Sequence, residues 1–246
     1  MALVEASWQT AYRVQENGYP AISAVSRGRA TDRGTWNRYD TSGTTVYLAD
    51  NAACAFQETI SPFKRRLGSV DPWQKDADAL GMSLEEFYDA VASDWEERQF
   101  MYTGTLPRRW REARSLHLVS LPKHGWWVDI EDAESLSALE KSMPHLIAGA
   151  GVLQLDRSQA LSLNRQLTTM LAEQVRASTL FDGSRAIGMV FGSRHGGGTN
   201  YAVWLRHHDD GLTGDTEGME VLATRPISFR DPSLETACRR FDIRAY

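Results

Sequence analysis

The segment TVYLADNAACAFQE, which runs from Thr45 to Glu58, joins a short run of β-branched and apolar residues to a run of small residues. Its first five residues predict a buried strand. Asp50 or Asn51 then caps a predicted helix, which Pro62 ends. A buried strand that runs into a helix places the side chains at its turn on the rim of a cleft. The segment therefore predicts part of the core and the edge of a binding site.

Glu58 lies near the second turn of this predicted helix, on a stretch otherwise made of Ala, Cys and Phe. A carboxylate on such a stretch is costly unless it is paired or faces a pocket. One interpretation puts Glu58 on the solvated face, where most helical glutamates lie. The other puts its carboxylate in the cleft.

The segment FGSRHGGGTN, which ends at Asn200, separates the predicted strands Ile187–Phe191 and Tyr201–Leu205. Three consecutive glycines allow a tight turn or the close approach of a ligand. Ser193 and Arg194 offer a hydroxyl and a guanidinium that can bind phosphate or ribose oxygens. The segment is not a P-loop, because no GK[ST] follows and it leads to a strand. The alternative is a hairpin loop without a ligand.

Arginines mark two further places near the N-terminus. Arg13 interrupts the short predicted strand Ala11–Val14, where a charged side chain either faces solvent or belongs to a site. The stretch Arg27 to Gly43, RGRATDRGTWNRYDTSG, holds four arginines and three glycines. Its polarity and length predict a long loop with a functional role.

Helices and strands alternate along the rest of the chain. The capping-box pattern Ser83–Glu86 starts one predicted helix, and Ser158 is expected to cap the longest one. The remaining predicted elements are the strands Ser115–Leu121 and Gly218–Thr224 and the helices Ala133–Ser142 and Leu234–Phe241. This interleaving predicts an α+β fold with a mixed sheet, in a single domain over residues 1–246.

Composition excludes several classes of protein. The 246 residues carry 27 basic and 32 acidic side chains, a formal charge of −5, so we expect no direct binding to nucleic acid. No run approaches the roughly 20 apolar residues of a membrane helix, and the first residues lack a secretory signal pattern. We therefore expect a cytoplasmic protein with no membrane partner. Cys54 and Cys238 are expected to be buried thiols. The run His207 to Asp210 predicts a solvated turn and no metal site.

Taken in order, these segments resemble the RES domain family, which is named for Arg, Glu and Ser. The residues that carry the resemblance are Arg13, the run Tyr47-Leu48-Ala49 with Glu58 eleven residues past the tyrosine, and Gly192-Ser193-Arg194 followed by glycines. The family's Gly-Arg-aromatic loop matches in two registers, Gly34 to Asn37 or Asn37 to Asp40. The second register keeps the arginine and is preferred, which names Arg38. The resemblance covers both ends of the chain, and the middle, about residues 63–178, is interpreted as a long helical insertion.

The resemblance implies a fold similar to ADP-ribosyltransferase toxins, with a largely antiparallel sheet. It implies a toxin of a toxin–antitoxin pair that cleaves the nicotinamide–ribose bond of NAD⁺. The acceptor would be phosphate, as in an NAD⁺ phosphorylase, or water, as in an NAD⁺ glycohydrolase. The neutralising partner would be an antitoxin with an Xre-type helix-turn-helix domain, or another immunity protein. The alternatives are an ADP-ribosyltransferase that modifies a protein target and, less favoured, a binding module without catalysis.

The resemblance also assigns roles to residues. The catalytic set would be Glu58, Arg13 and Ser193, and the NAD⁺-binding set Tyr47, Arg38, Arg194 and Tyr12. Glu58 would stabilise positive charge on the ribose, and Arg13 and Arg38 would bind the pyrophosphate. Tyr47 would stack on nicotinamide and offer its hydroxyl as a hydrogen-bond partner, while Ser193 would position a ribose or phosphate oxygen. No metal or redox cofactor is expected, because NAD⁺ is the substrate and inorganic phosphate a candidate co-substrate.

Overall fold

One sheet of eight strands takes its members from the whole length of the chain. The computed structural model describes residues 1–65, 68, 71, 73–97, 104–212 and 214–246. The strand order is β1-β6-β7-β8-β3-β2-β5-β9, and every neighbouring pair is antiparallel except β6 with β7. The strands are β1 (Leu3–Glu5), β2 (Thr10–Glu16), β3 (Thr45–Ala49), β5 (Arg114–Ser120), β6 (Trp126–Asp129), β7 (Gly188–Gly192), β8 (Thr199–Trp204) and β9 (Glu220–Pro226). The predicted α+β fold with a mixed, largely antiparallel sheet is confirmed.

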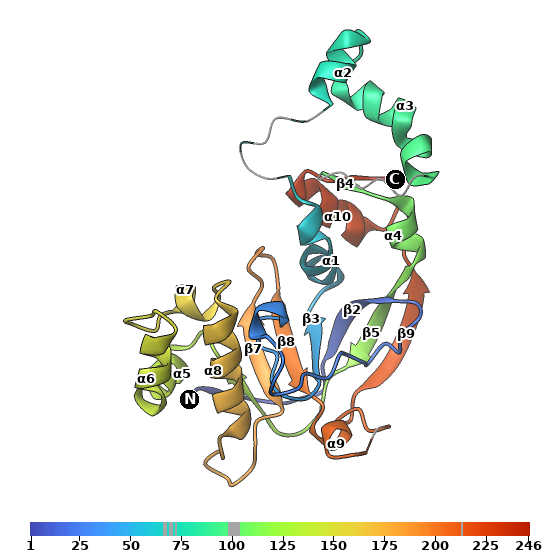
Figure 1. Ribbon diagram of the computed structural model, residues 1–246. Helices are drawn as coiled ribbons and strands as arrows, with labels where there is room; N and C mark the ends of the chain where they lie inside the picture. The colour runs from blue at the N-terminus through green and yellow to red at the C-terminus, as the bar shows by residue number, and fades with distance from the viewer. Residues whose placement is uncertain (66–67, 69–70, 72, 98–103, 213) are drawn as a thin grey trace.

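The helices gather in separate groups around this sheet (Figure 1). Beside β7 lie α5 (Ala133–Ser142), α6 (Pro144–Gly149), α7 (Arg157–Ala160) and α8 (Arg165–Ala177). A second group holds α1 (Ala52–Ile60), α4 (Arg108–Glu112) and α10 (Pro232–Phe241), with the short parallel pair β4 (Thr105–Leu106) and β10 (Arg244–Ala245). Beyond it project α2 (Gln74–Ala79) and α3 (Leu84–Glu97), and α9 (Arg206–Asp209) follows β8. Two 3-10 turns, η1 (Arg33–Thr35) and η2 (Ser61–Phe63), complete the elements.

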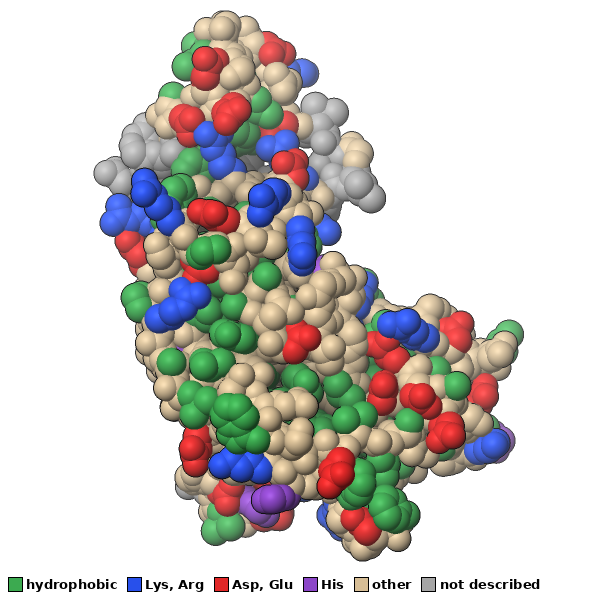
Figure 2. All heavy atoms as spheres, turned by 180° about the vertical axis from the view of Figure 1, so that it is seen from behind, with side chains coloured by type: hydrophobic (Ala, Val, Ile, Leu, Met, Phe, Trp, Pro, Cys, Tyr) green, Lys and Arg blue, Asp and Glu red, His purple; other side chains and the backbone are tan. Residues whose placement is uncertain are grey.

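Seen from behind, the molecule has two protruding ends, one formed by α2 and α3 and the other by the α5–α8 group (Figure 2). The largest core cluster lies under the second of these, where Leu167, Leu171 and Val175 of α8 meet Met189 and Trp204 of the sheet. These five side chains are fully buried. Burial of an apolar stripe of this kind is what holds a helix to a sheet. The helix α8 is therefore held to the sheet by the apolar face that contains Leu167, Leu171 and Val175.

That helix begins later than its sequence predicts. Ser158 belongs to the short helix α7, whose cap is Asp156. The helix α8 starts at Arg165, because the side chain of Asn164 accepts a hydrogen bond from the amide of Leu167 at 3.1 Å. The prediction that Ser158 caps this helix is wrong, since Asn164 satisfies a free amide at the true start. As a result Arg165 stands at a helix terminus.

The middle of the chain contributes to the sheet as well as to the helices. The interval 63–178, expected to be a helical insertion, contains β5, which pairs with β2 and β9, and β6, which pairs with β1 and β7. The alternating segment Ser115–Leu121 predicts the first of these strands. The second strand, β6, has four residues and pairs in parallel with a strand about sixty residues later, so no local sequence pattern predicts it. The two cysteines are buried and free, as predicted.

The run His207 to Asp210 is largely exposed, in agreement with the predicted solvated turn, but Arg206–Asp209 form the short helix α9. The side chain of Asp209 is 15% exposed and forms an ion pair with Arg176 at 2.7 Å. The side chain of His207 lies within 3.1 Å of Asp215 and 3.6 Å of Glu217.

Among the residues that the structure describes, no helix is both long enough and apolar enough to cross a membrane.

Candidate active site

The sheet opens between β2 and β3, and this opening forms the main cavity of the site. The two strands share a single residue pair, Tyr12 with Ala49. Beyond that pair they part, and side chains from both strands line a cavity of about 630 Å³. The other walls come from α1, the loop before β3, the turn between β7 and β8, and the start of α8. The cavity is lined by Tyr12, Arg13, Val14, Gln15, Asn37, Arg38, Tyr47, Leu48, Ala49, Ala55, Glu58, Thr59, Ser61, Pro62, Leu163, Arg165, Phe191, Arg194, His195 and Asn200.

Glu58 is the carboxylate of this cavity. Its helix α1 starts with Asn51, whose side chain accepts a hydrogen bond from the amide of Cys54 at 2.9 Å. The buried side chains of α1 include Phe56 and Ile60, and packing of this face turns the half-buried Glu58 toward the parted strands. The structure therefore favours the interpretation that Glu58 faces a pocket over the one that puts it on a solvated face.

Two donors hold the Glu58 carboxylate in one orientation. Its Oε1 accepts a hydrogen bond from Ser193 Oγ at 2.7 Å and a second from Asn200 Nδ2 at 2.9 Å. Within the described part of the chain, Oε2 receives no hydrogen bond. Hydrogen bonds to an ionised group are about twice as strong as neutral ones. The carboxylate is thus fixed through one oxygen, and the other is left for a ligand.

The turn between β7 and β8 explains how Ser193 reaches Glu58. Gly196 and Gly197 have φ values of +73° and +82°, which other residues rarely adopt. A side chain at Gly198 would lie within 2.7 Å of atoms of Asp50, Asn51 and Cys54. The third glycine therefore serves close packing of the turn against α1, rather than the approach of a ligand. This packing places the hydroxyl of Ser193 on the α1 carboxylate.

Arg13 lines the cavity, but its guanidinium is already engaged. Its Nη1 donates to the carbonyl of Ala21 at 2.9 Å, and its Nη2 donates to the carbonyl of Ser23 at 2.5 Å and to Gln15 Oε1 at 3.4 Å. Burial lowers the pKa of Arg13 to about 10, so the group stays charged at neutral pH. The loop that follows β2 thus occupies both arms of the fork that was predicted to hold a pyrophosphate.

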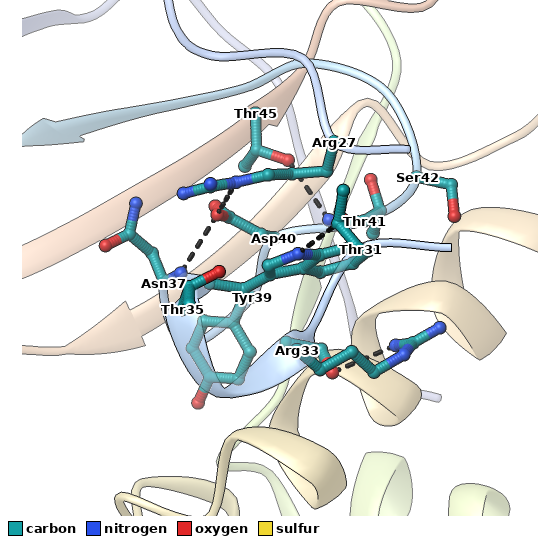
Figure 3. Close-up of polar contacts among 12 residues, drawn as sticks. Arg27, Thr31, Arg33, Thr35, Asn37, Tyr39, Asp40, Thr41, Ser42 and Thr45 are labelled. Atoms are coloured by element: carbon teal, nitrogen blue, oxygen red, sulfur yellow. Dashed lines mark hydrogen bonds and ion pairs between the residues drawn. The ribbon is translucent and has the colours of Figure 1, made fainter. Parts of the chain in front are cut away.

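The loop Arg27 to Gly43, which the structure describes in full, separates its arginines by role. Arg27 forms an ion pair with Asp40 at 2.8 Å (Figure 3). Arg33 donates to Thr169 at 2.9 Å and lies 4.9 Å from the ring centre of Trp36. Arg38 lines the cavity, and no carboxylate within 4 Å pairs with it among the described residues. The preferred register, Asn37 to Asp40, thus names an arginine that lines this cavity.

Tyr47 presents its ring to the cavity and directs its hydroxyl elsewhere. The hydroxyl donates to Asp40 Oδ1 at 2.9 Å and accepts from the amide of Tyr39 at 3.0 Å. Burial, and then the neighbouring Asp40 charge, raises the pKa of Tyr47 well above its ordinary value. Asp40 and Tyr39 therefore already engage this hydroxyl, and its hydrogen bond to a ligand stays a prediction. Tyr12 lines the cavity on the opposite strand of the parted pair.

Several cavity residues were missed from the sequence, among them Asn200, His195 and Arg165. Asn200 is a buried polar residue in an otherwise apolar strand, which is a signal that could have found it. His195 packs its ring 5.1 Å from that of Phe241, and burial lowers its pKa while the Glu58 charge opposes this. Nothing local to Arg165 indicated a site, because α8 was predicted to start elsewhere.

Comparisons with known proteins give little. No protein-family model matches the chain, and no curated protein sequence is significantly similar to it. Among solved structures, a chain of the M. tuberculosis MbcT–MbcA toxin–antitoxin complex aligns with a TM-score of 0.45 and 13% identity. The alignment covers 97% of this chain and 91% of that chain. A likeness this distant establishes neither a shared fold nor a shared function.

Proposed function

We propose that the protein degrades NAD⁺ by cleaving its nicotinamide–ribose bond, with phosphate or water as the acceptor. The observation that carries the proposal is the Glu58 carboxylate, held at 2.7 and 2.9 Å by Ser193 and Asn200 in a cavity that four arginines also line. A fixed negative charge and several cations match a substrate with an electron-poor ribose and a pyrophosphate. The RES resemblance of the same residues supports this choice of substrate.

The reaction is one that a carboxylate of this kind can accelerate. The bond from the pyridinium nitrogen to the ribose C1′ breaks, and its electron pair leaves with nicotinamide, which becomes neutral. No general acid is required. Positive charge develops on the ribose, as in glycoside hydrolysis, and Glu58 stabilises it. The acceptor oxygen then bonds to C1′. Phosphate as the acceptor gives the 1-phosphate of ADP-ribose, and water as the acceptor gives ADP-ribose and a proton.

The other cavity residues bind and orient the substrate. Ser193 and Asn200 keep the Glu58 carboxylate from rotating, so that little reorganisation is required as charge develops. The ring of Tyr47 gives nicotinamide a surface on which to stack. Arg38 and Arg194 bind phosphate oxygens. Arg13 does so only if Ala21 and Ser23 release it, and we expect its first role to be to hold their loop against the cavity. The reaction as proposed uses no metal or redox cofactor.

Replacement of Glu58 tests the proposal. We expect Glu58→Gln to lower the rate of nicotinamide release from NAD⁺ by about 10²- to 10³-fold, the effect of losing one preorganised charge. The melting temperature should stay close to that of the wild type. Glu235→Gln, on the exposed face of α10, is the matched control and should keep full activity. A Glu58→Gln protein with most of the wild-type rate would refute the proposal.

The acceptor is identified in the same assay. Nicotinamide release that requires added phosphate indicates phosphorolysis, and release in phosphate-free buffer indicates hydrolysis. NAD⁺ loss only when a macromolecule is added would instead favour an ADP-ribosyltransferase. No loss under any condition, with NAD⁺ still bound, would favour a binding module.

Unrestrained depletion of NAD⁺ would harm the cell that makes the protein, unless the activity is neutralised. By its resemblance to the RES family, we propose a toxin that acts in the cytoplasm and is neutralised by an antitoxin with an Xre-type helix-turn-helix domain or by another immunity protein. Induced expression of the wild type should deplete cellular NAD⁺ and arrest growth, and Glu58→Gln should do neither.

A further inference from the structure

Three arginines from distant parts of the sequence converge on the cavity. Arg38 comes from the loop before β3, Arg165 from the first turn of α8, and Arg194 from the turn after β7. Within the described part of the chain, none of the three forms an ion pair with a carboxylate. Other arginines of the molecule do, including Arg27, Arg157 and Arg176.

Two of the three guanidinium groups also keep unused donors inside the protein. Arg38 Nε and Arg165 Nη1 are shielded from solvent and have no hydrogen-bond partner among the described residues. A donor removed from water without a partner is unfavourable. Such groups in a native fold call for an explanation, and an acceptor brought by a ligand supplies one.

The three charges also act on one another. Burial lowers the pKa of Arg38, and the charges of Arg194 and Arg165 contribute to this effect, while Glu58 opposes it. Arg38 lies 5.9 Å from the ring centre of Phe191 and 5.8 Å from that of Tyr39, so its guanidinium packs beside aromatic rings. An anion between these arginines would relieve both their repulsion and their missing hydrogen bonds.

The charge of the cavity as a whole agrees with an anionic ligand. Four arginines and one glutamate line it, an excess of three positive charges in a chain whose net charge is −5. The pyrophosphate of a dinucleotide carries two negative charges, which would neutralise two of these three excess positive charges and leave one for a further anion. Arginine forks match phosphate oxygens in geometry as well as in charge.

We propose that Arg165, together with Arg38 and Arg194, forms a phosphate-binding site in which Arg165 is supplied by the middle of the chain. The phosphate belongs either to the dinucleotide or to free inorganic phosphate, and this choice rests on the proposed function. Arg165 is the residue that the N-terminal and C-terminal motifs do not contain. Its position as the first residue of the 13-residue helix α8 adds the positive end of the helix dipole to the site.

Binding measurements without turnover test the site. Isothermal titration calorimetry of the full chain with inorganic phosphate, pyrophosphate and ADP-ribose should detect binding of at least one of the three. We expect Arg165→Gln to weaken that binding at least tenfold, since it removes hydrogen bonds between charged groups. Arg165→Lys keeps the charge without the fork and should weaken it less. The matched control Arg185→Gln removes an exposed arginine outside the cavity and should bind as the wild type does.

The pattern across ligands identifies the source of the phosphate. Loss of binding confined to inorganic phosphate indicates a co-substrate site, and loss confined to pyrophosphate and ADP-ribose indicates the dinucleotide. An Arg165→Gln protein that melts like the wild type and binds all three ligands equally well overturns the site. Phosphate binding that depends on Arg165, without nicotinamide release by the wild type, would uphold the site and refute NAD⁺ cleavage.

Discussion

Two regions of the molecule use the same residue type in opposite ways. At the base of the loop before β3, Arg27 pairs with Asp40, which is 3% exposed and also accepts hydrogen bonds from Tyr47 and the amide of Asn37. In the cavity, Arg38 of the same loop pairs with no carboxylate among the described residues, and Arg165 and Arg194 line the same cavity. We call the first region the closed network, because its charged groups are paired with each other, and the second the open region, because its cations have no paired carboxylate among the described residues.

The difference separates residues that fold the protein from residues that bind a ligand. A buried charge with all its partners stabilises one conformation, and removing one partner leaves the other unpaired. A cluster of like charges with unused donors lowers stability unless a ligand neutralises it. The comparison predicts that mutations in the two regions change different measured quantities, even when the change of residue is the same.

The largest expected effect is on stability, in the closed network. Arg27→Gln leaves Asp40 without its cation, and we expect a loss of about 3 kcal/mol in the free energy of unfolding. For a chain of this size that loss corresponds to roughly 10 °C in melting temperature. Calorimetry or thermal denaturation followed by circular dichroism measures it. A melting temperature within about 2 °C of the wild type would show that the pair of Arg27 with Asp40 does not stabilise the fold.

The same substitution in the open region should act on binding. Arg38→Gln removes charge-assisted hydrogen bonds to phosphate oxygens, worth about 1.5–3 kcal/mol, so we expect KM for NAD⁺ to rise about ten- to hundredfold. The melting temperature should not fall, because a repulsive cation has been removed. Initial-rate kinetics beside a melting curve checks both. A destabilised Arg38→Gln protein with unchanged KM would mean that Arg38 serves the fold.

The smallest effect concerns His117, a histidine outside the cavity with a buried ring nitrogen. His117 on β5 bonds Thr224 through Nδ1 at 2.9 Å, while its Nε2 is buried and unpartnered within the described residues. Burial, and then the charge of Arg13, lowers the pKa of His117 below its ordinary value of 6.5. The unfolded chain therefore binds this proton more tightly, so stability falls as the pH decreases below about 6.5.

The variant His117→Gln should reduce that acid sensitivity without changing the cavity. The measurement is the melting temperature between about pH 5 and 7.5, taken as a difference between variant and wild type. His195 has a lowered pKa as well and remains in both proteins, so the difference isolates His117. Parallel curves for the two proteins would show that His117 does not contribute to the acid sensitivity.

Local signals in the sequence predicted several of the helices and strands. The helix Ala133–Ser142 has the predicted bounds, the strand predicted at Ser115–Leu121 runs one residue earlier, and the capping box holds, with Glu86 accepting from the Ser83 amide at 2.8 Å. Such features depend on a few neighbouring residues. β1 and β6 were missed because they are short and are held by partners far away in the sequence.

The sequence by itself predicted a strand at Thr45–Ala49 that runs into a helix capped by Asp50 or Asn51. It also named Glu58, Ser193 and three arginines, Arg13, Arg38 and Arg194, as candidates for one site. The tertiary structure alone decided that β2 and β3 share a single residue pair, that Asp40 accepts a hydrogen bond from the hydroxyl of Tyr47, and that Arg165 and Arg38 line the same cavity. The physical reason is range. Caps and alternation act within a turn or a few residues, whereas the lining of this cavity comes from segments that only packing brings together.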